Sequence, residues 1–337
     1  MQKKNPAKRR PERLVVTLLS LLFLSTAVFA TVKYVFRAPE LDTDKPVVTP
    51  DGTASADADR TDTDEPDALG RTRRKYCYNI LVSGLDDDNG GSDTNILVRF
   101  DVPNKRIDLV SLPRDTLLHN EYRNNKLNFA YAKGGTELLM EQIENLLGIP
   151  VDFYVTVNLK DFIALVDQID GVDFDIPINM DYDDPYQDLH IHFTKGPRHL
   201  NGQEAMEVVR FRHNNDGTGY GTEDIGRIGT QQAFLKAVAK QLLQIGNVKN
   251  IPALVDIFYT YVKTDLTTGN LVWLGNEALN IGTENIHFAT LPGDGSGYYN
   301  KQSVYVLDAQ ATCDLVNEAL NPYNEALTLE DMDILVP

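Results

Sequence analysis

The sequence predicts an α/β protein: a three-layer α/β/α domain with a central mixed β-sheet, preceded by one transmembrane helix. Three observations predict it. From Tyr76 onward, short runs rich in Ile, Leu and Val alternate with longer runs of helical periodicity. Ahead of that point, residues 14–32 carry no charge. Hydrophobic residues make up 42% of the 337 residues, which is enough for a folded core.

A basic tail and an apolar run open the chain. We interpret residues 1–13 as a cytoplasmic basic tail and residues 14–35 as a transmembrane anchor, because the uncharged run spans roughly 28 Å as a helix. Basic residues before the run predict a single-pass protein of the cell membrane with a cytoplasmic N-terminus and an extracellular domain. The alternative is a signal peptide cleaved near residues 28–30. Both interpretations export residues 37–337.

Residues 36–75 are expected to form a disordered acidic linker. Ser, Thr, Asp, Ala and Pro dominate them, so they cannot bury enough apolar surface to offset chain entropy. Arg71, Arg73, Arg74 and Lys75 end this segment. A solvated turn is the simpler interpretation of these cations, and a contact with lipid head groups or a phosphate-rich ligand is the alternative.

The extracytoplasmic domain is expected to cover residues 76–337, with its motifs within 76–245. Strands are predicted where β-branched and large apolar residues cluster, and helices where apolar residues recur every three or four positions. Asn201 and Glu204 form a capping box for a short helix. The predicted strands are 78–82, 95–100, 107–112, 151–157, 172–176, 188–193 and 286–291, and the predicted helices are 136–147, 159–168, 225–245, 252–262 and 270–279.

Acidic residues crowd the turn after the first predicted strand. Asp86, Asp87, Asp88 and Asp93 lie within eight residues, an arrangement that is unfavourable unless a cation screens it. Carboxylate oxygens suit Mg²⁺, with Mn²⁺ as an alternative. An EF-hand is excluded because Leu97 stands where the twelfth-position Glu is needed. A solvated Asp-Gly turn is the competing interpretation.

Arg114 and Asp115 follow the third predicted strand and are expected at the same sheet edge as Asp86. An arginine there is suited to a bidentate phosphate contact or to pairing with Asp115. Lys126 and Asn128 come next and are candidates for the same cleft, although a surface lysine on an amphipathic helix explains Lys126 equally well.

A second group of basic residues lies further along. Arg210 and Arg212 share a face if the chain is extended there. Asp224, Arg227 and Gln231 share one helix face, close to a helix N-terminus that favours anions. Together these residues predict a binding site that holds phosphate or pyrophosphate between several arginines. The competing interpretation is that the arginines form surface salt bridges with the abundant acidic residues.

Other classes of site find little support. The net charge of −17 argues against nucleic acid as a partner. No Walker A loop, G-x-S-x-G elbow or H-E-x-x-H motif is present. His190 and His192 alternate on a predicted strand but lack an evident third ligand, so we expect ordinary strand residues. Residues 293–297 are expected to be a mobile loop, and Cys77 and Cys313 are compatible with one disulfide.

In combination and in order, these motifs resemble the LytR-CpsA-Psr family. The resemblance covers roughly residues 76–245. It rests on N-I-L-V-x-G-x-D (79–86), G-S-D-T (91–94), S-L-P-R-D (111–115), K-L-N-x-A-Y (126–131), D-F-Y-V-x-V (152–157), L-N-G-x-E-A (200–205), R-F-R (210–212) and D-I-G-R-I-x-x-Q-Q (224–232).

The resemblance implies a cell-wall glycopolymer ligase. Such an enzyme transfers a teichoic acid or capsule polymer from a polyprenyl-pyrophosphate carrier to the 6-hydroxyl of muramic acid in peptidoglycan. Asp86 and Asp93 would hold Mg²⁺. The implied catalytic residues are Arg114, Arg210, Arg212, Arg227, Asp115 and Asp224, and the implied substrate-binding residues are Arg114, Lys126, Asn128, Arg210, Arg212, Arg227 and Gln231.

Two departures from the family pattern stand out. Gly91 and Thr230 occupy positions where the family often has arginine, so the predicted phosphate-binding site has two arginines fewer. Two rival functions remain open. A pyrophosphatase of lipid carriers would use the same residues with water as acceptor, and a sensor of lipid-linked intermediates would bind without turnover.

Overall fold

The computed structural model describes residues 37–41, 47–48, 54–55, 66–67, 69–85, 90–120, 122–186, 189–221, 223–245 and 251–337. The expected anchor, residues 14–35, lies outside these residues. Among the helices that the structure does describe, none combines the length and apolarity that a membrane span requires.

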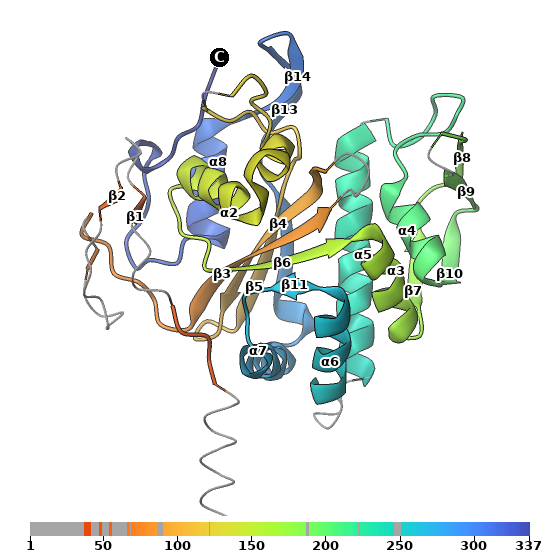
Figure 1. Ribbon diagram of the computed structural model, residues 1–337, viewed down its shortest axis with the longest axis horizontal. Helices are drawn as coiled ribbons and strands as arrows, with labels where there is room; N and C mark the ends of the chain where they lie inside the picture. The colour runs from red at the N-terminus through yellow and green to blue at the C-terminus, as the bar shows by residue number, and fades with distance from the viewer. Residues whose placement is uncertain are drawn as a thin grey trace, which may run out of the picture.

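A six-stranded mixed sheet forms the centre of the molecule (Figure 1). β3 (Cys77–Leu85) pairs antiparallel with β4 (Ser92–Asp101) and parallel with β6 (Phe153–Asn158). β5 (Arg106–Leu112) pairs antiparallel with β4 and parallel with β12 (Ile286–Thr290). The short β11 (Lys263–Thr264) completes the order β11-β6-β3-β4-β5-β12. The predicted mixed sheet is confirmed.

Helices cover both faces of this sheet. Neighbouring residues of a strand point to opposite faces. Leu81 therefore packs with α2 (Leu127–Leu147) and α8 (Ala309–Ala319). Ile80 packs on the other face with α7 (Thr268–Ile281) and α6 (Ile251–Tyr261). The two apolar clusters give the α/β/α layering, and each predicted strand and helix overlaps an observed element.

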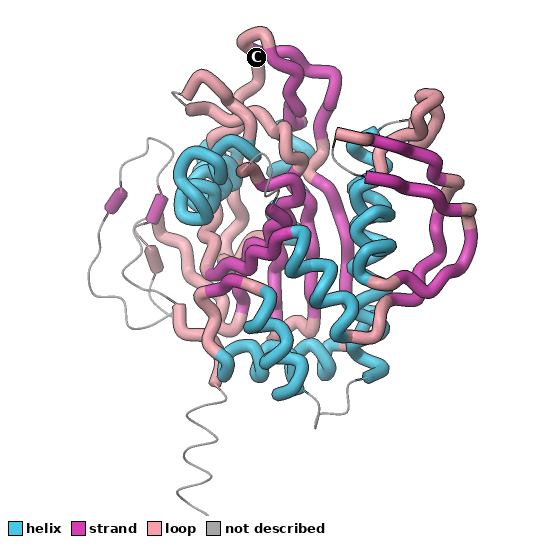
Figure 2. Tube along the Cα trace, turned by 45° about the vertical axis from the view of Figure 1, so that its right-hand side comes forward, coloured by secondary structure: helices cyan, strands magenta, loops and turns pink. Residues whose placement is uncertain are grey.

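A second unit with its own core lies beside the sheet (Figures 1 and 2). Two antiparallel pairs build it, β7 (Val172–Ile176) with β10 (Gly196–Leu200) and β8 (Met180–Asp184) with β9 (Leu189–Phe193). It packs on α3 (Leu159–Gln168), α4 (Gly202–Arg210) and α5 (Glu223–Ile245). The capping box at the start of α4 is confirmed.

Two local predictions are corrected. The expected mobile loop at residues 293–297 is part of β13 (Gly293–Tyr299), which pairs with β14 (Gln302–Leu307) through a bulge after Asp294. The helix expected to begin at residue 136 begins at Leu127 instead. Gly134 and Gly135 interrupt it with non-helical angles, and the φ of +68° at Gly135 favours glycine. Lesser elements are β1 (Val47–Val48), β2 (Ala54–Ser55), η2 (Thr283–Asn285) and η3 (Leu329–Asp331).

The end of the expected linker is built into the domain. Arg71 pairs with Asp67 at 2.9 Å, and both side chains are less than 10% exposed. Arg74 pairs with Asp101 at 2.6 Å, and Arg73 pairs with Asp152. Arg71, Arg73 and Arg74 are therefore neither a solvated turn nor a lipid contact, because Arg71 donates to the Gly148 carbonyl at 3.3 Å and the other two pair with carboxylates of the domain.

Two further observations concern the flanks and the thiols. The Tyr78 hydroxyl donates to the Pro39 carbonyl at 2.9 Å, so residues near the expected anchor contact the start of β3. Cys77 and Cys313 are free, buried thiols, and no disulfide joins them. Burial raises the pKa of Cys77 to about 11, so this thiol stays protonated at neutral pH.

Candidate functional site

Several chain segments meet at one edge of the central sheet. β3, β5, β6 and β12 end at this edge, and β4, which runs against them, begins there. The turn before β4, the segment after β5 and the segment after β12 are therefore neighbours. This edge is where binding sites of open α/β sheets occur, and two cavities open at it.

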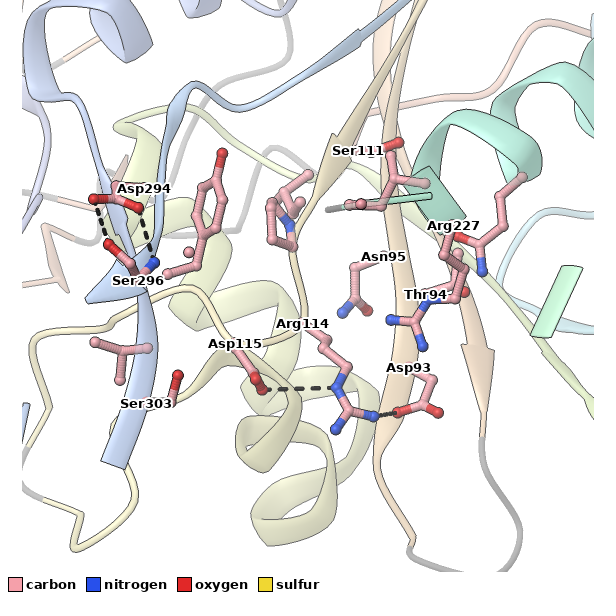
Figure 3. A pocket seen from close by; sticks show the side chains of 18 residues that line it. Asp93, Thr94, Asn95, Ser111, Arg114, Asp115, Arg227, Asp294, Ser296 and Ser303 are labelled. Carbon is pink, nitrogen blue, oxygen red and sulfur yellow. Dashed lines mark hydrogen bonds and ion pairs between the residues drawn. The ribbon is translucent and has the colours of Figure 1, made fainter. Parts of the chain in front are cut away.

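The first cavity, here called the polar lobe, has a volume of about 510 Å³ (Figure 3). Residues from β4, the end of β5, α5 and the β13–β14 hairpin line it. They include charged, hydroxyl and amide side chains: Asp93, Thr94, Asn95, Ser111, Arg114, Asp115, Arg227, Gln231, Asp294, Ser296 and Ser303.

A chain of ion pairs crosses the polar lobe. The Arg114 Nη1 atom lies 2.5 Å from Asp93 Oδ1, and its Nε atom lies 3.7 Å from Asp115 Oδ1 (Figure 3). Lys126 Nζ lies 3.1 Å from Asp115 Oδ2. The four side chains are only 18–38% exposed. Water is thus partly excluded, which strengthens electrostatic interactions with a bound ligand.

Two of the α5 residues predicted from their spacing to share one helix face, Arg227 and Gln231, lie together at the site. Arg227 is 5% exposed, and both Arg227 and Gln231 line the polar lobe and its neighbour. The next residue fastens the helix to the sheet, because Gln232 Nε2 donates to the Ala289 carbonyl at 2.8 Å and contacts Ser111 Oγ at 3.0 Å. The backbone position of Asp224 lies in the first turn of α5, and its side chain is outside the described part.

The second cavity, here called the apolar lobe, has a volume of about 400 Å³. It lies between the sheet and helices α3 and α5, and β8 and β9 contribute to its wall. It shares Asp93, Thr94, Arg114, Arg227 and Gln231 with the polar lobe. Its other lining is largely apolar: Val82, Leu85, Ile96, Val157, Leu159, Phe162, Leu189, Val209, Phe211, Phe234 and Leu235.

Arg210 and Arg212 both line the apolar lobe, and the chain is extended only at the residue between them. Arg210 is the last residue of α4, so the chain is not extended there. Phe211 follows as the C-cap with φ −59° and ψ 134° and buries its ring. The extended angles at Phe211, one residue beyond the end of α4, let the arginines on either side of it reach the same cavity.

The remaining predicted residues fall into two groups. Lys126 reaches the site through Asp115, whereas Asn128 lines neither lobe and donates its backbone N–H to the Arg114 carbonyl at 2.9 Å. Asp86 lies outside the described residues, as do Asp87 and Asp88. Thr230 stands where the LytR-CpsA-Psr pattern often has arginine. Its side chain is buried, and its hydroxyl contacts that of Tyr220 at 2.6 Å.

Sequence reasoning missed the contribution of the β13–β14 hairpin and of several strand-end hydroxyls. Asp294, Ser296 and Ser303 enter the polar lobe because β13 and β14 fold back toward Arg114. The glycine-rich composition of residues 293–297 concealed this strand. Ser111 and Thr94 were present in the recognised motifs, and their position at strand ends was the available signal.

Comparison with known proteins agrees with the geometry. The family model described as "LytR_cpsA_psr family" matches residues 47–321. A relative from Bacillus subtilis named polyisoprenyl-teichoic acid–peptidoglycan teichoic acid transferase TagV is 31% identical over 252 residues, covering 71% of this chain and 62% of that protein. A second relative, from Bacillus cereus, is named polyisoprenyl-teichoic acid–peptidoglycan teichoic acid transferase TagU. It is 32% identical, over 71% of this chain and 76% of its own length.

A solved structure shows the same fold. The crystal structure of Bacillus subtilis TagV superimposes with a TM-score of 0.63 and 27% identity, covering 78% of this chain and all of that chain. The chain matches somewhat less than two thirds of the full-length TagV relative.

Proposed function

The chain belongs to the LytR_cpsA_psr family, and on that premise we propose that it transfers a glycopolymer from a polyprenyl-pyrophosphate carrier to peptidoglycan. The relatives named as teichoic acid transferases support glycopolymer transfer at the level of the family. For this chain we propose a phosphotransferase with the muramic acid 6-hydroxyl as acceptor, active in assembly of teichoic acid, capsule or another wall polymer.

One observation carries the proposal. A polar lobe rich in guanidinium and carboxylate groups adjoins an apolar lobe, and the two share Arg114, Arg227 and Asp93. A polyprenyl pyrophosphate has the same division, since a dianionic head group is joined to a long hydrocarbon chain. The shared residues stand where the head group would meet the chain, which is a position suited to binding phosphate oxygens.

The donor set at the polar lobe fits a hard divalent cation. Asp93 is 38% exposed and presents carboxylate oxygen at the cavity, and such oxygens are the preferred ligands of Mg²⁺. We propose that Asp93, with Asp86, holds Mg²⁺, with Mn²⁺ as a substitute. The ion would neutralise charge on the pyrophosphate.

The protein's own groups supply the rest of the mechanism. The acceptor hydroxyl attacks the phosphorus that bears the glycan, and the bond to the bridging oxygen breaks, so that polyprenyl phosphate leaves. Phosphoryl transfer of this kind depends on positioning and charge stabilisation. Arg114 and Arg227 would stabilise the equatorial oxygens, with Arg210 and Arg212 at the side of the apolar lobe.

Two carboxylates are candidates for the acceptor proton. Asp115 lines the polar lobe and is held between Arg114 and Lys126, so its orientation is fixed. Asp224 belongs to the same turn of α5 as Arg227. We propose that one of them orients or deprotonates the sugar hydroxyl. Gln231 donates to the Val209 carbonyl at 3.2 Å and lines the polar lobe. We propose that it contacts the pyrophosphate of the donor.

We also propose that the chain works at the outer face of the cell membrane, held by residues 14–35. The support is the uncharged run and the basic residues before it. A lipid-linked donor and a wall acceptor meet at that face.

The test uses the full chain in detergent with a polyprenyl-pyrophosphate-linked glycan and a peptidoglycan oligomer. Mass spectrometry follows polyprenyl phosphate and the glycan–peptidoglycan adduct, with Mg²⁺ and with EDTA. We expect a Mg²⁺-dependent adduct. Release of polyprenyl phosphate without an adduct would instead identify a carrier pyrophosphatase, and retention of unchanged lipid under both conditions would identify a sensor.

A further inference from the structure

The outer face of the β8–β9 hairpin gathers two histidines and two aspartates. In the register of the pair, Asp183 lies opposite His190 and Asp181 lies opposite His192. Side chains two residues apart on a strand share a face, so all four project to solvent. The intervening residues, such as Ile191, face the core of the second unit.

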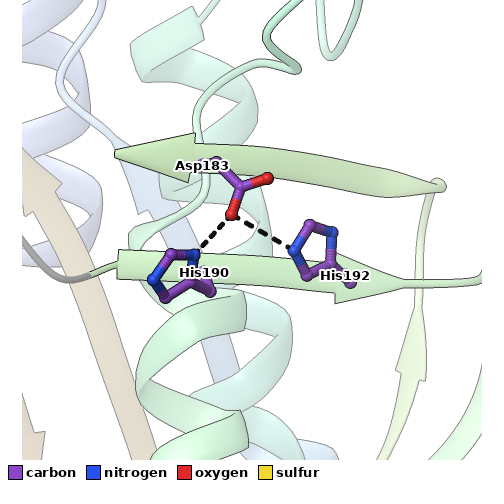
Figure 4. A group of neighbouring side chains, drawn as sticks. All are labelled: Asp183, His190 and His192. Carbon is purple, nitrogen blue, oxygen red and sulfur yellow. Dashed lines mark hydrogen bonds and ion pairs between the residues drawn. The ribbon is translucent and has the colours of Figure 1, made fainter. Parts of the chain in front are cut away.

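Three of these side chains converge on one point (Figure 4). Ligand atoms of Asp183, His190 and His192 all lie within 4.8 Å of one another. Asp183 Oδ1 is 3.3 Å from His192 Nε2 and contacts His190 Nδ1 more closely. Bonds of about 2.0–2.1 Å to a tetrahedral Zn²⁺ place two ligand atoms about 3.3 Å apart. The 3.3 Å separation already matches, whereas Asp183 Oδ1 and His190 Nδ1 must move apart to admit the ion.

A fourth residue orients one of the histidines. Asp181 Oδ1 lies 2.8 Å from His192 Nδ1. When Nδ1 carries the proton and donates it to Asp181, the Nε2 lone pair is directed at Asp183 and His190. Metal-binding histidines generally have such a carboxylate behind them, which fixes the tautomer and the ring orientation.

We propose that Asp183, His190 and His192 form a binding site for a first-row transition divalent cation, with Asp181 as its positioning residue. Two imidazoles and one carboxylate select ions such as Zn²⁺, whereas Mg²⁺ prefers oxygen ligands alone. Water completes the coordination, since the three side chains are 50–55% exposed. Within the described part of the chain, this is the one group of its kind.

The site has a direct structural consequence. Tyr182 and Leu189 belong to the same two strands and line the apolar lobe from the other side. An ion bound between β8 and β9 joins the strands by coordination bonds and so stiffens this wall of the lobe. The buried thiols do not compete for the ion, because burial raises the pKa of both Cys77 and Cys313.

The test is metal binding by the full chain in detergent, stripped of metal and dialysed against micromolar Zn²⁺ in millimolar Mg²⁺. We expect one tightly bound equivalent of Zn²⁺. His192→Gln and Asp183→Asn each remove a ligand and should weaken binding by more than the roughly 10- to 100-fold that loss of an outer-shell partner causes. Asp181→Ala should weaken it less, and Asp181→Asn, which can still accept the histidine proton, should restore it. Bound Co²⁺ gives an independent readout, because its visible spectrum reports coordination by nitrogen and oxygen.

His199→Gln is the matched control. His199 is an equally exposed histidine that pairs with Asp173 on the neighbouring β7–β10 pair. Its substitution should leave Zn²⁺ binding unchanged. At about pH 9, exposed substitutions of this kind should also leave the thermal unfolding midpoint of the metal-free chain unaltered. The proposal is overturned if the wild-type chain binds no Zn²⁺, or if His192→Gln and Asp183→Asn retain full affinity. Neither result bears on glycopolymer transfer.

Discussion

The sheet-edge site and the β8–β9 hairpin both gather charged side chains, but they do so in different surroundings. At the sheet edge, Arg227 is 5% exposed and Arg114 is 26% exposed. On the hairpin, Asp183 is 50% exposed and Asp181 is 83% exposed. A charge shielded from water acts strongly on a bound ligand. The edge is thus suited to stabilising phosphate charge, whereas the hairpin can hold a ligand only through direct coordination.

The two regions also assemble differently. The edge joins segments distant in the chain, from β4, β5, α5 and β13, while the hairpin joins adjacent strands. Helix α5 links the regions, because Arg227 and Gln231 face the lobes and Phe234 enters the core of the second unit. The comparison therefore predicts that damage to this core reaches the edge, whereas damage to exposed hairpin residues does not.

Phe234→Ala should have the largest effect on stability. The ring is 1% exposed and lies 5.7 Å from that of Phe174 and 5.9 Å from that of Phe162. Its removal should lower the free energy of unfolding by about 3–5 kcal/mol, measured by denaturant titration. Tyr186→Ala, at a residue that is 99% exposed, is the control and should change little. Equal losses in the two variants would contradict the assigned core.

Arg114→Ala should have the largest effect on activity. Loss of a charge-stabilising donor should reduce the rate of glycan transfer by about 100- to 1,000-fold, while the unfolding midpoint shows that the domain remains folded. Arg198→Ala is the matched control. Arg198 pairs with Glu204 on the second unit and is 47% exposed, so its loss should leave transfer unchanged. Wild-type turnover in Arg114→Ala would refute the role of the edge arginines.

Much of the edge could be predicted from sequence because its signals are local. Arg114 follows a strand directly, and the i, i+4 spacing of Arg227 and Gln231 places both on one helix face. The cap at Asn201 is likewise a short-range pattern, and the structure contains it. The antiparallel strand β4 begins at the edge where β5 ends, so local signals were sufficient to bring Asp93 and Arg114 together.

The hairpin site could not be predicted because it depends on pairing. His190 and His192 were visible as alternating residues, but Asp183 joins them only through the register of β8 with β9. Residues 180–184 carry three carboxylates and little β-branched sequence, so no strand was predicted there. The β13 strand was missed for a similar reason, since its glycines are typical of a loop until pairing with β14 is known.

Gln232→Leu should show whether the position of α5 at the sheet edge affects activity beyond its effect on the stability of the protein. The Gln232 amide donates to groups at the sheet edge, and its loss leaves half-buried acceptors such as the Ala289 carbonyl without this donor. The free energy of unfolding should fall by about 1–3 kcal/mol. We expect kcat to fall more than KM rises, because Gln232 fixes the position of α5, the helix that carries Arg227, against the sheet edge.

Gln241→Leu is the control on the same helix. Gln241 Nε2 donates to the Ile169 carbonyl at 3.1 Å, far along α5 from the lobes. Its loss should lower stability comparably and leave kcat intact. A similar fall of kcat in both variants would show that Gln232 acts through general stability alone.

His199→Gln should have the smallest effect, and a pH-dependent one. His199 Nδ1 lies 2.7 Å from Asp173 Oδ1, and this hydrogen bond raises the pKa of the imidazole above its ordinary value. A raised folded-state pKa means that the stabilisation is fully present below about pH 6.5, the unfolded value, and is lost as pH rises through the folded value. The effect is small because the imidazole is 55% exposed and solvent screens the pair.

Unfolding midpoints of the wild type and His199→Gln should therefore differ at about pH 5 and converge at about pH 9. Asp173→Asn removes the carboxylate charge and should abolish most of the same pH dependence, because Asp173 supplies the largest contribution to the shift. A difference that stays constant across this range would mean that the pair contributes by packing. Convergence, with only a small difference at about pH 5, would show that an ion pair between exposed side chains contributes weakly.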